Sequence, residues 1–396
     1  MTEITNQMIQ ELAWQYKTPL YIFDTDIFGR RFGYYREAFG MDVQINYCMK
    51  TNPLLTEASL PYTNRIEVCS YGEFLICKEL GVPAKQLLIS GVLKKYEDMV
   101  EIIAYGKEDA LYTAESIDQL EVMNRIAMDC GLKLNVYYRL QWGQFGMDEE
   151  TILSLLQEDK YRGLVFYGIH YFTGTQKRRL QQFRKELEYL DKFLIRICDV
   201  TGKSVEHLEY GPGFGVPYFV DQEEVATVEL LQQFRELLIT MRWKGAVSIE
   251  LGRALAYDCG YYVVQIRDIK SSGGKNYCIC DGGIHQVNYD GQLRGMYRPI
   301  MRSITKKEDE LKEQEHYIIC GSLCTGNDIL LQDYQTTKVQ EGDYLVFERT
   351  GAYSIYEGMS LFLSHEIPGV CLCNRTDGFS LVRPQQQSYH INTIHV

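Results

Sequence analysis

A lysine stands directly after a short apolar run near the beginning of the chain. Residues 43–49 have the length and composition of a buried strand, and Lys50 follows them, ahead of a Thr-Asn-Pro turn at residues 51–53. An amine held at a strand end in a partly dry pocket loses its proton readily, which suits a Schiff-base lysine. The position equally suits a solvated loop lysine, and this short stretch alone leaves both interpretations open.

Other residues of chemical interest end or follow further strand-like runs. A glycine-rich loop at residues 211–215 suits phosphate, because backbone N–H groups can approach an anion closely there. A lysine, a phosphate loop and a Glu–Arg pair together suggest pyridoxal phosphate. Each residue also has a structural interpretation, as a turn, an ion pair or a core histidine, and only the joint placement favours a site. The residues are Glu67, Arg139, His170, Phe172, Thr175, Gly211, Gly213, Glu250 and Arg253.

The elements that must position these residues alternate between strand and helix patterns. Eight β-branched or aromatic runs alternate with amphipathic segments, which predicts a parallel sheet. Eight units of this size fit a closed (β/α)8 barrel, assigned here to residues 27–262. A doubly wound open sheet is the alternative, but no Gly-x-Gly-x-x-Gly follows the first strand. The runs are 43–49, 66–70, 87–91, 110–115, 134–140, 164–172, 207–213 and 246–252.

The pattern changes near residue 262. Strand-like runs then follow one another without long helices, separated by turn residues such as Ser-Ser-Gly-Gly at 271–274. We therefore predict an all-β domain over residues 263–396. Residues 1–26 are expected to contribute to it, with a strand at 20–23.

The bulk composition excludes some classes of function. The chain has 396 residues and a net charge of −12 without long runs of one sign, which disfavours nucleic acid and anionic membranes as partners. It contains no membrane-spanning apolar run, and its polar amino terminus does not resemble a signal peptide, so we expect a cytoplasmic protein. The twelve cysteines lack zinc-site spacing and are expected to be free thiols, with no metal bound.

Six motifs in order resemble the fold-type III pyridoxal-phosphate decarboxylases. That family includes the diaminopimelate, ornithine and arginine decarboxylases, and its barrel is similar to that of alanine racemase. The motifs are Tyr-Cys-Met-Lys-Thr-Asn at 47–52, Glu-Val-Cys-Ser-x-Gly-Glu at 67–73, Gln-Phe-Gly-Met at 144–147, Glu-Leu-Gly-Arg at 250–253, Gly-Ser-Leu-Cys-Thr-Gly-Asn-Asp at 321–328 and Gly-Ala-Tyr at 351–353.

The resemblance implies a role for each matching residue. Lys50 would form the Schiff base, Glu250 would bond the pyridine nitrogen, and Cys324 would protonate the carbanion left by CO2. The family also implies a homodimer with shared active sites. The implied cofactor contacts are Lys50, Glu67, Arg139, Phe172, Thr175, Gly211, Gly213, Phe214, Glu250, Gly252, Arg253 and Tyr353, and the implied substrate contacts are Arg253, Arg298, Arg302, Thr325 and Asp328.

Departures from the family pattern bear on the substrate. Phe172 replaces the ring-stacking histidine and can stack but cannot donate a proton. Pro212 removes one N–H donor from the glycine loop. Thr325 replaces the Glu with which diaminopimelate decarboxylases bind a distal ammonium group, and Arg302 replaces the tyrosine of their Arg-Pro-x-x-Tyr motif. The distal pocket thus loses a negative charge and gains a positive one, so we expect a substrate with a neutral or anionic far end.

The sequence thus predicts a lyase that decarboxylates an amino acid or an amino-acyl conjugate. Its Phe-Thr-Gly-Thr-Gln and Phe-Gly-Val-Pro-Tyr-Phe runs resemble a subgroup in antibiotic biosynthesis, which includes the butirosin-pathway decarboxylase of glutamate tethered to an acyl carrier protein. The alternatives are an amino-acid racemase on the same barrel and a catalytically inactive relative that binds a partner.

Overall fold

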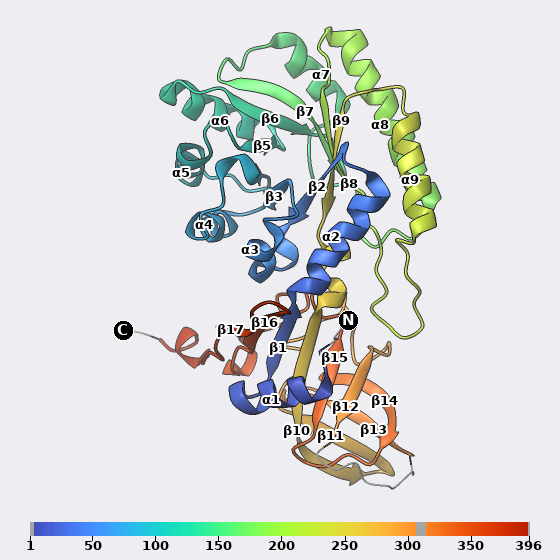
Figure 1. Ribbon diagram of the computed structural model, residues 1–396. Helices are drawn as coiled ribbons and strands as arrows, with labels where there is room; N and C mark the ends of the chain where they lie inside the picture. The colour runs from blue at the N-terminus through green and yellow to red at the C-terminus, as the bar shows by residue number, and fades with distance from the viewer. Residues whose placement is uncertain (1–3, 306–313, 395–396) are drawn as a thin grey trace. The chain divides into compact units, whose positions relative to one another are not determined.

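The computed structural model describes residues 4–305 and 314–394, which fall into two compact units (Figure 1). The barrel unit comprises Gly29–Val216 and Glu224–Leu255, and the β-domain unit comprises Met1–Phe28, Pro217–Glu223 and Ala256–Val396. Relative to the barrel range predicted from sequence, residues 27–28, 217–223 and 256–262 lie in the β-domain unit. Residues 1–3, 306–313 and 395–396 of the ranges predicted for the β-domain lie outside the described residues.

The barrel predicted from the eight alternating runs is confirmed. Each strand pairs in parallel with the next, and pairing between the last and the first closes the barrel, which excludes the open-sheet alternative. The closing register sets Asn46 opposite Glu250. The strands are β2 (Val43–Cys48), β3 (Arg65–Val68), β4 (Leu87–Ile89), β5 (Leu111–Ala114), β6 (Leu134–Arg139), β7 (Leu164–Phe172), β8 (His207–Gly211) and β9 (Ala246–Leu251).

Helices surround the barrel strands (Figure 1). The longest, α8, buries a stripe that includes Phe183, Leu187 and Leu190 at helical spacing, and it ends at Gly202 in the left-handed conformation. Side chains of Ser70, Ser116 and Thr227 cap other helices. The helices are α2 (Thr25–Phe39), α3 (Thr56–Ser59), α4 (Tyr71–Glu79), α5 (Tyr96–Gly106), α6 (Ile117–Cys130), α7 (Glu149–Glu158), α8 (Leu180–Thr201), α9 (Val228–Thr240) and α10 (Arg253–Ala256).

The β-domain unit is built on one mixed sheet. Its order is β14-β13-β11-β10-β1-β16-β17, with β15 paired to β10 and β12 paired to β15. The strand expected at residues 20–23 is β1, which lies between β10 and β16. The elements are α1 (Asn6–Tyr16), β1 (Leu20–Asp24), β10 (Gly260–Ser272), β11 (Lys275–Cys280), β12 (Met301–Ile304), β13 (Gln314–Cys320), β14 (Ile329–Thr337), β15 (Tyr344–Glu348), β16 (Gly369–Asn374) and β17 (Gly378–Arg383).

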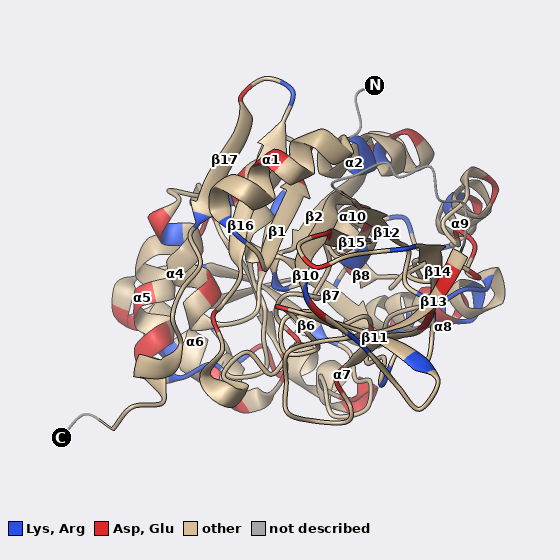
Figure 2. Cartoon of the chain, turned by 90° about the horizontal axis from the view of Figure 1, so that it is seen from below, with Lys and Arg blue, Asp and Glu red and all other residues tan. Residues whose placement is uncertain are grey.

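Basic and acidic residues are interspersed along the helices and strands, as Figure 2 shows. No helix among the described residues is long and apolar enough to cross a membrane. The cysteines are free thiols, as expected, and Cys278, Cys280, Cys371 and Cys373 are buried.

Gly168 provides a test of the barrel's strand pairing. The register of β6 on β7 shifts at this point, and a Cβ on Gly168 would lie 2.0 Å from the carbonyl oxygen of His207 on β8. We expect Gly168→Ala to lower the free energy of unfolding by about 1–3 kcal/mol, because backbone would have to move. Gly33→Ala is the control, since a Cβ on Gly33 has nothing within 4 Å. Equal denaturant midpoints for the two variants would contradict this account.

Candidate active site

Lys50 lies at the carboxyl end of β2, in the 3-10 turn η1 (Met49–Thr51). Its Nζ is 2.6 Å from Oε2 of Glu67 on the neighbouring strand β3, and the Glu67 side chain is only 3% exposed. Burial acts to raise the pKa of Glu67, but the Lys50 charge outweighs burial and lowers that pKa to about 2. The strand-end lysine is therefore the partner of a buried, ionised carboxylate.

The same neighbours hold the proton on Lys50. Burial alone would lower the pKa of Lys50, but the Cys69 and Glu67 side chains beside it raise that pKa well above its ordinary value. Burial and the Glu67 charge in turn raise the pKa of the Cys69 thiol, so this thiol stays protonated at neutral pH. Glu67 is consequently the anion that keeps Lys50 cationic.

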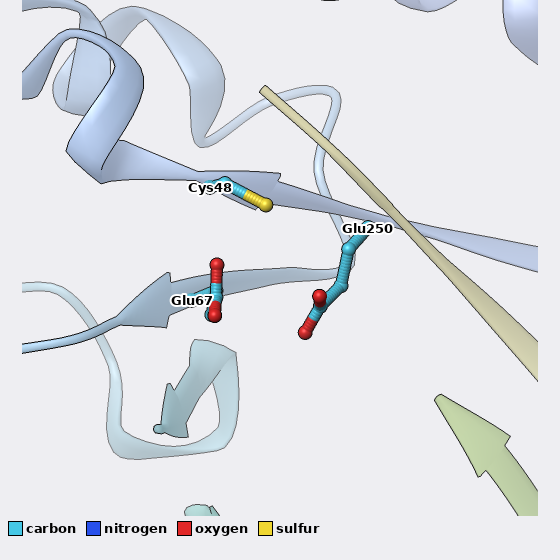
Figure 3. A group of neighbouring side chains, drawn as sticks. All are labelled: Cys48, Glu67 and Glu250. Carbon is cyan, nitrogen blue, oxygen red and sulfur yellow. The ribbon is translucent and has the colours of Figure 1, made fainter. Parts of the chain in front are cut away.

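Two thiols flank the Lys50–Glu67 pair. The Sγ of Cys69 is 3.5 Å from Lys50 Nζ and 3.2 Å from Glu67 Oε1. Ligand atoms of Cys48, Glu67 and Glu250 all lie within 4.8 Å of one another, converging as Figure 3 shows. These three side chains are close enough to coordinate a metal ion, but the Lys50 ammonium beside Glu67 would repel a metal cation. Cys48 and Cys69 belong to two of the sequence motifs, but neither thiol was given a role from sequence, so this placement was missed.

Glu250, in β9, has a histidine partner. The His170 Nε2 on β7 is 3.2 Å from Glu250 Oε1, and the two side chains are 1% and 5% exposed. A buried carboxylate is costly unless it has a polar partner, and His170 is that partner for Glu250. His170 was weighed from sequence as an ordinary core histidine. Its strand-end position was the signal that pointed to the site.

Gly211 lies close to both the Phe172 ring and the Glu250 carboxylate. A Cβ on Gly211 would lie 2.7 Å from Cδ2 of Phe172 and 3.3 Å from Oε2 of Glu250. Glycine at position 211 thus lets the Phe172 ring approach the backbone close to the Glu250 carboxylate. A pyridine ring that is protonated on nitrogen needs an aromatic face for stacking and a carboxylate that accepts the N–H hydrogen bond. Phe172 and Glu250 offer these two groups, so the residues present fit a pyridinium ring.

The two loops expected to hold phosphate interlock. Gly213 has φ of +62°, and a Cβ there would lie 2.1 Å from the carbonyl oxygen of Gly174. Lys177 N–H donates to Gly213 O at 3.0 Å, and Gly215 N–H donates to Lys177 O at 2.8 Å. Glycine at position 213 is therefore required for both its conformation and the close approach of the loops.

Arg253 and Gly252 join this loop region to the lysine turn. Arg253 Nε donates to Thr175 Oγ1 at 3.3 Å. A Cβ on Gly252 would lie 2.1 Å from Oγ1 of Thr51, so its absence lets the β9–α10 turn pack on η1. Phe214 behaves differently, because its buried ring packs against Phe183 in the helix layer. A cofactor contact from Phe214 would have to come from its backbone.

Glu186, on α8, ties these elements together. Its carboxylate accepts hydrogen bonds from Thr173 Oγ1 at 2.5 Å, Lys177 Nζ at 2.8 Å and Tyr210 OH at 2.5 Å. Thr173 and Lys177 bracket the loop that contains Thr175, and Tyr210 belongs to β8. Glu186 therefore fixes both ends of this loop against the strand that leads into the glycine loop. Sequence reasoning missed this residue.

Arg139 ends β6 and is already paired. Its Nη1 is 2.5 Å from Glu115 Oε1, and its guanidinium lies over the ring of Phe145, 4.7 Å from the centroid.

Lys94 was not singled out from sequence, and burial lowers its pKa to about 8 despite the nearby Glu115 charge. Its Nζ donates to Gly91 O at 2.6 Å.

The remaining predicted residues belong to the β-domain unit. Cys324 is exposed, and Thr325 and Asp328 follow it in the same turn. The buried Asp328 carboxylate accepts hydrogen bonds from the backbone N–H groups of Leu323 at 2.8 Å and Ile284 at 2.9 Å. These bonds indicate that Asp328 positions the Cys324 turn, whereas the sequence predicted a substrate contact.

The two predicted substrate arginines of the β-domain unit have acidic partners within this unit. Arg298 is 3.0 Å from Asp221, and Arg302 pairs with Glu348 and donates to Asn6 at 2.9 Å. Binding a substrate anion would require either arginine to exchange its present partner. Tyr353, of the Gly-Ala-Tyr motif, has φ of +64°, and its role stays a prediction.

Sequence comparison with known proteins finds decarboxylases. The family model described as "Pyridoxal-dependent decarboxylase, C-terminal sheet domain" matches residues 20–351. The chain is 27% identical to the diaminopimelate decarboxylase of Aquifex aeolicus, covering 87% of this chain and 84% of that protein. It is 26% identical to the L-glutamyl-[BtrI acyl-carrier protein] decarboxylase of Niallia circulans, covering 95% and 93%.

Solved structures show the same fold. The diaminopimelate decarboxylase of Methanocaldococcus jannaschii, in a complex with L-lysine, superimposes with a TM-score of 0.85 at 23% identity, covering 98% of this chain and 94% of that chain. Its barrel and sheet arrangement therefore matches the fold described above.

The proton on Lys50 predicts how cofactor uptake depends on pH. Attack on an aldehyde requires the neutral amine, and the pKa of Lys50 is raised, so uptake of pyridoxal phosphate by the apoprotein should accelerate as pH increases. Glu67→Gln removes the anion that raises this pKa and should accelerate uptake near neutral pH, followed by visible absorption. Glu57→Gln, which changes an exposed glutamate of α3, is the control. Slower uptake by Glu67→Gln at every pH would contradict the assignment.

The Glu186 contacts predict a loss of cofactor affinity. Glu186→Gln removes the charge that accepts three hydrogen bonds and should loosen the loop around Thr175. We expect the Kd for pyridoxal phosphate, measured by equilibrium dialysis, to increase about tenfold. Glu188→Gln, exposed on the same helix, should leave the Kd unchanged. A Kd that is equal in the two variants would show that Glu186 serves folding alone.

Proposed function

Because the chain belongs to the pyridoxal-dependent decarboxylase family, we propose that it removes the α-carboxyl group of an amino acid or amino-acyl conjugate, with Lys50 as the residue that carries the cofactor. The family, the cofactor and the carboxy-lyase class expected from the six motifs are confirmed. The roles of individual residues below are our proposals.

The observation that carries the residue assignment is the joint placement of four groups at one end of the barrel. Lys50, the glycine loop after β8, Glu250 and Arg253 all lie at the carboxyl ends of β2, β8 and β9, where barrel enzymes hold their chemistry. No single group is specific. A strand-end amine, an aromatic ring close to a carboxylate, and a glycine loop that can bind an anion are together what this cofactor requires.

Each group has a defined task in this proposal. When bound, pyridoxal phosphate supplies an electron-withdrawing ring that accepts the electron pair left behind by CO2. Glu250, supported by His170, would hold a proton on the ring nitrogen, and Phe172 would stack on the ring face. Thr175, Gly213 and Arg253 would bind the phosphate. Lys50 would take up the cofactor when its proton leaves.

The proton that replaces the carboxylate is assigned to Cys324. Its exposure leaves the thiol free to reach a substrate, and Asp328 holds the turn that presents it. We further propose a homodimer with shared active sites, a cytoplasmic location and a role in secondary metabolism such as antibiotic biosynthesis.

The substrate is proposed to be joined to an acyl carrier protein. Support comes from the relative whose printed name is L-glutamyl-[BtrI acyl-carrier protein] decarboxylase, which covers nearly the whole chain. Thr325, in place of an acidic residue, removes a charge that would favour a distal ammonium group. A free diamine precursor, as in diaminopimelate decarboxylation, is the competing substrate class.

A cofactor and CO2 assay tests the proposal. Purified protein loaded with pyridoxal phosphate should absorb visible light and release CO2 from at least one free or carrier-linked amino acid. Lys50→Ala should lose the lysine-dependent absorption and the activity, whereas the exposed Lys95→Ala should keep both.

Two other results would favour the alternatives. Inversion of the substrate's α-carbon without CO2 release would support the racemase. Wild-type protein that takes up no cofactor would support an inactive binding protein.

A further inference from the structure

A cluster of exposed cations lies where the chain leaves β7 and enters α8. We call it the basic rim, defined as Arg178, Arg179, Arg184 and Lys185, all of which are exposed. Among the described residues, none of the four forms an ion pair. Arg178 donates to the backbone oxygen of Val216 at 3.3 Å, and the other three side chains are directed to solvent.

The charge of the basic rim is opposite to that of the whole chain. The net charge is −12, so four unpaired cations within eight residues are a local exception. Glu186, which directly follows the rim, does not compensate, because its carboxylate binds Thr173, Lys177 and Tyr210. The first turn of α8 contains no acidic residue, although a helix amino terminus favours negative charge. The four cations of the basic rim are therefore available to bind an anionic surface of another molecule.

The rim lies at the end of the barrel that holds the candidate active site. The loop from Thr173 to Lys177 leads into it and contains Thr175, which contacts Arg253. Lys50 follows β2 at the same, carboxyl-terminal end of the parallel barrel. A partner bound at the rim would thus be on the same face as the lysine that carries the cofactor.

We propose that the basic rim docks an acidic carrier protein, which presents the amino-acyl substrate on a flexible thioester arm. This inference rests on the proposed carrier-linked substrate. The rim is too small, on a chain too acidic overall, for a long polyanion such as a nucleic acid. A compact acidic domain needs only local complementarity, which increases the association rate and weakens with salt.

Two thioester substrates distinguish an effect on carrier-protein docking from an effect on the decarboxylation step. One carries glutamate on an acidic acyl carrier protein, and the other carries glutamate on pantetheine. In the holoenzyme, R184E/K185E should raise KM for the carrier-linked substrate about tenfold at low salt and leave kcat/KM for the pantetheine thioester unchanged. The control R242E/K244E changes two exposed cations just before β9, at the opposite end of the barrel, and should alter neither value.

Direct binding provides an independent measurement. Fluorescence anisotropy of a labelled carrier protein should show weaker binding to R184E/K185E than to R242E/K244E, and unchanged melting temperatures would establish that both variants are folded. Use of both thioesters with the same KM in the two variants would overturn the docking site but leave the proposed function intact. Release of CO2 from free amino acids alone would overturn the carrier-linked substrate and the docking site together.

Discussion

The ion pair between Lys50 and Glu67 is the interaction around which the candidate site is built. Glu67 is almost fully enclosed by the barrel, and an isolated buried carboxylate would be protonated instead of charged. The 2.6 Å contact with Lys50 keeps it ionised, and the charge in turn keeps Lys50 protonated. Each group thus determines the protonation state of the other, so the amine becomes reactive only when the pair is disturbed.

A second buried carboxylate, Glu250 of β9, contacts His170 of β7. The two carboxylates lie near each other and near Cys48 (Figure 3). Like charges at this separation would repel strongly without partners. Pairing each with a different cationic or polar group lets the barrel hold one acceptor for the lysine and another for the cofactor ring.

Rigid loops complete the site at the phosphate end. The glycine loop and the loop from Thr173 to Lys177 approach so closely that a side chain at Gly213 has no room. Glu186 then fixes the second loop from the helix layer. Because the Glu186 carboxylate binds these loop and strand groups, it does not pair with the cations of the basic rim, which stay unpaired at the surface. One helix therefore supports both the inferred phosphate loop and the inferred docking surface.

The sequence by itself determined the fold class, the family and the residues at the strand ends. Alternating strand and helix periods specify a parallel barrel, and motifs such as Glu-Leu-Gly-Arg at 250–253 remain recognisable because they are local in the chain. Tertiary structure decided the partners: Cys69 beside Lys50, His170 beside Glu250, Glu186 across three elements, and acidic partners for Arg298 and Arg302. These contacts join residues far apart in sequence or on different elements, and only barrel closure and side-chain packing bring them together.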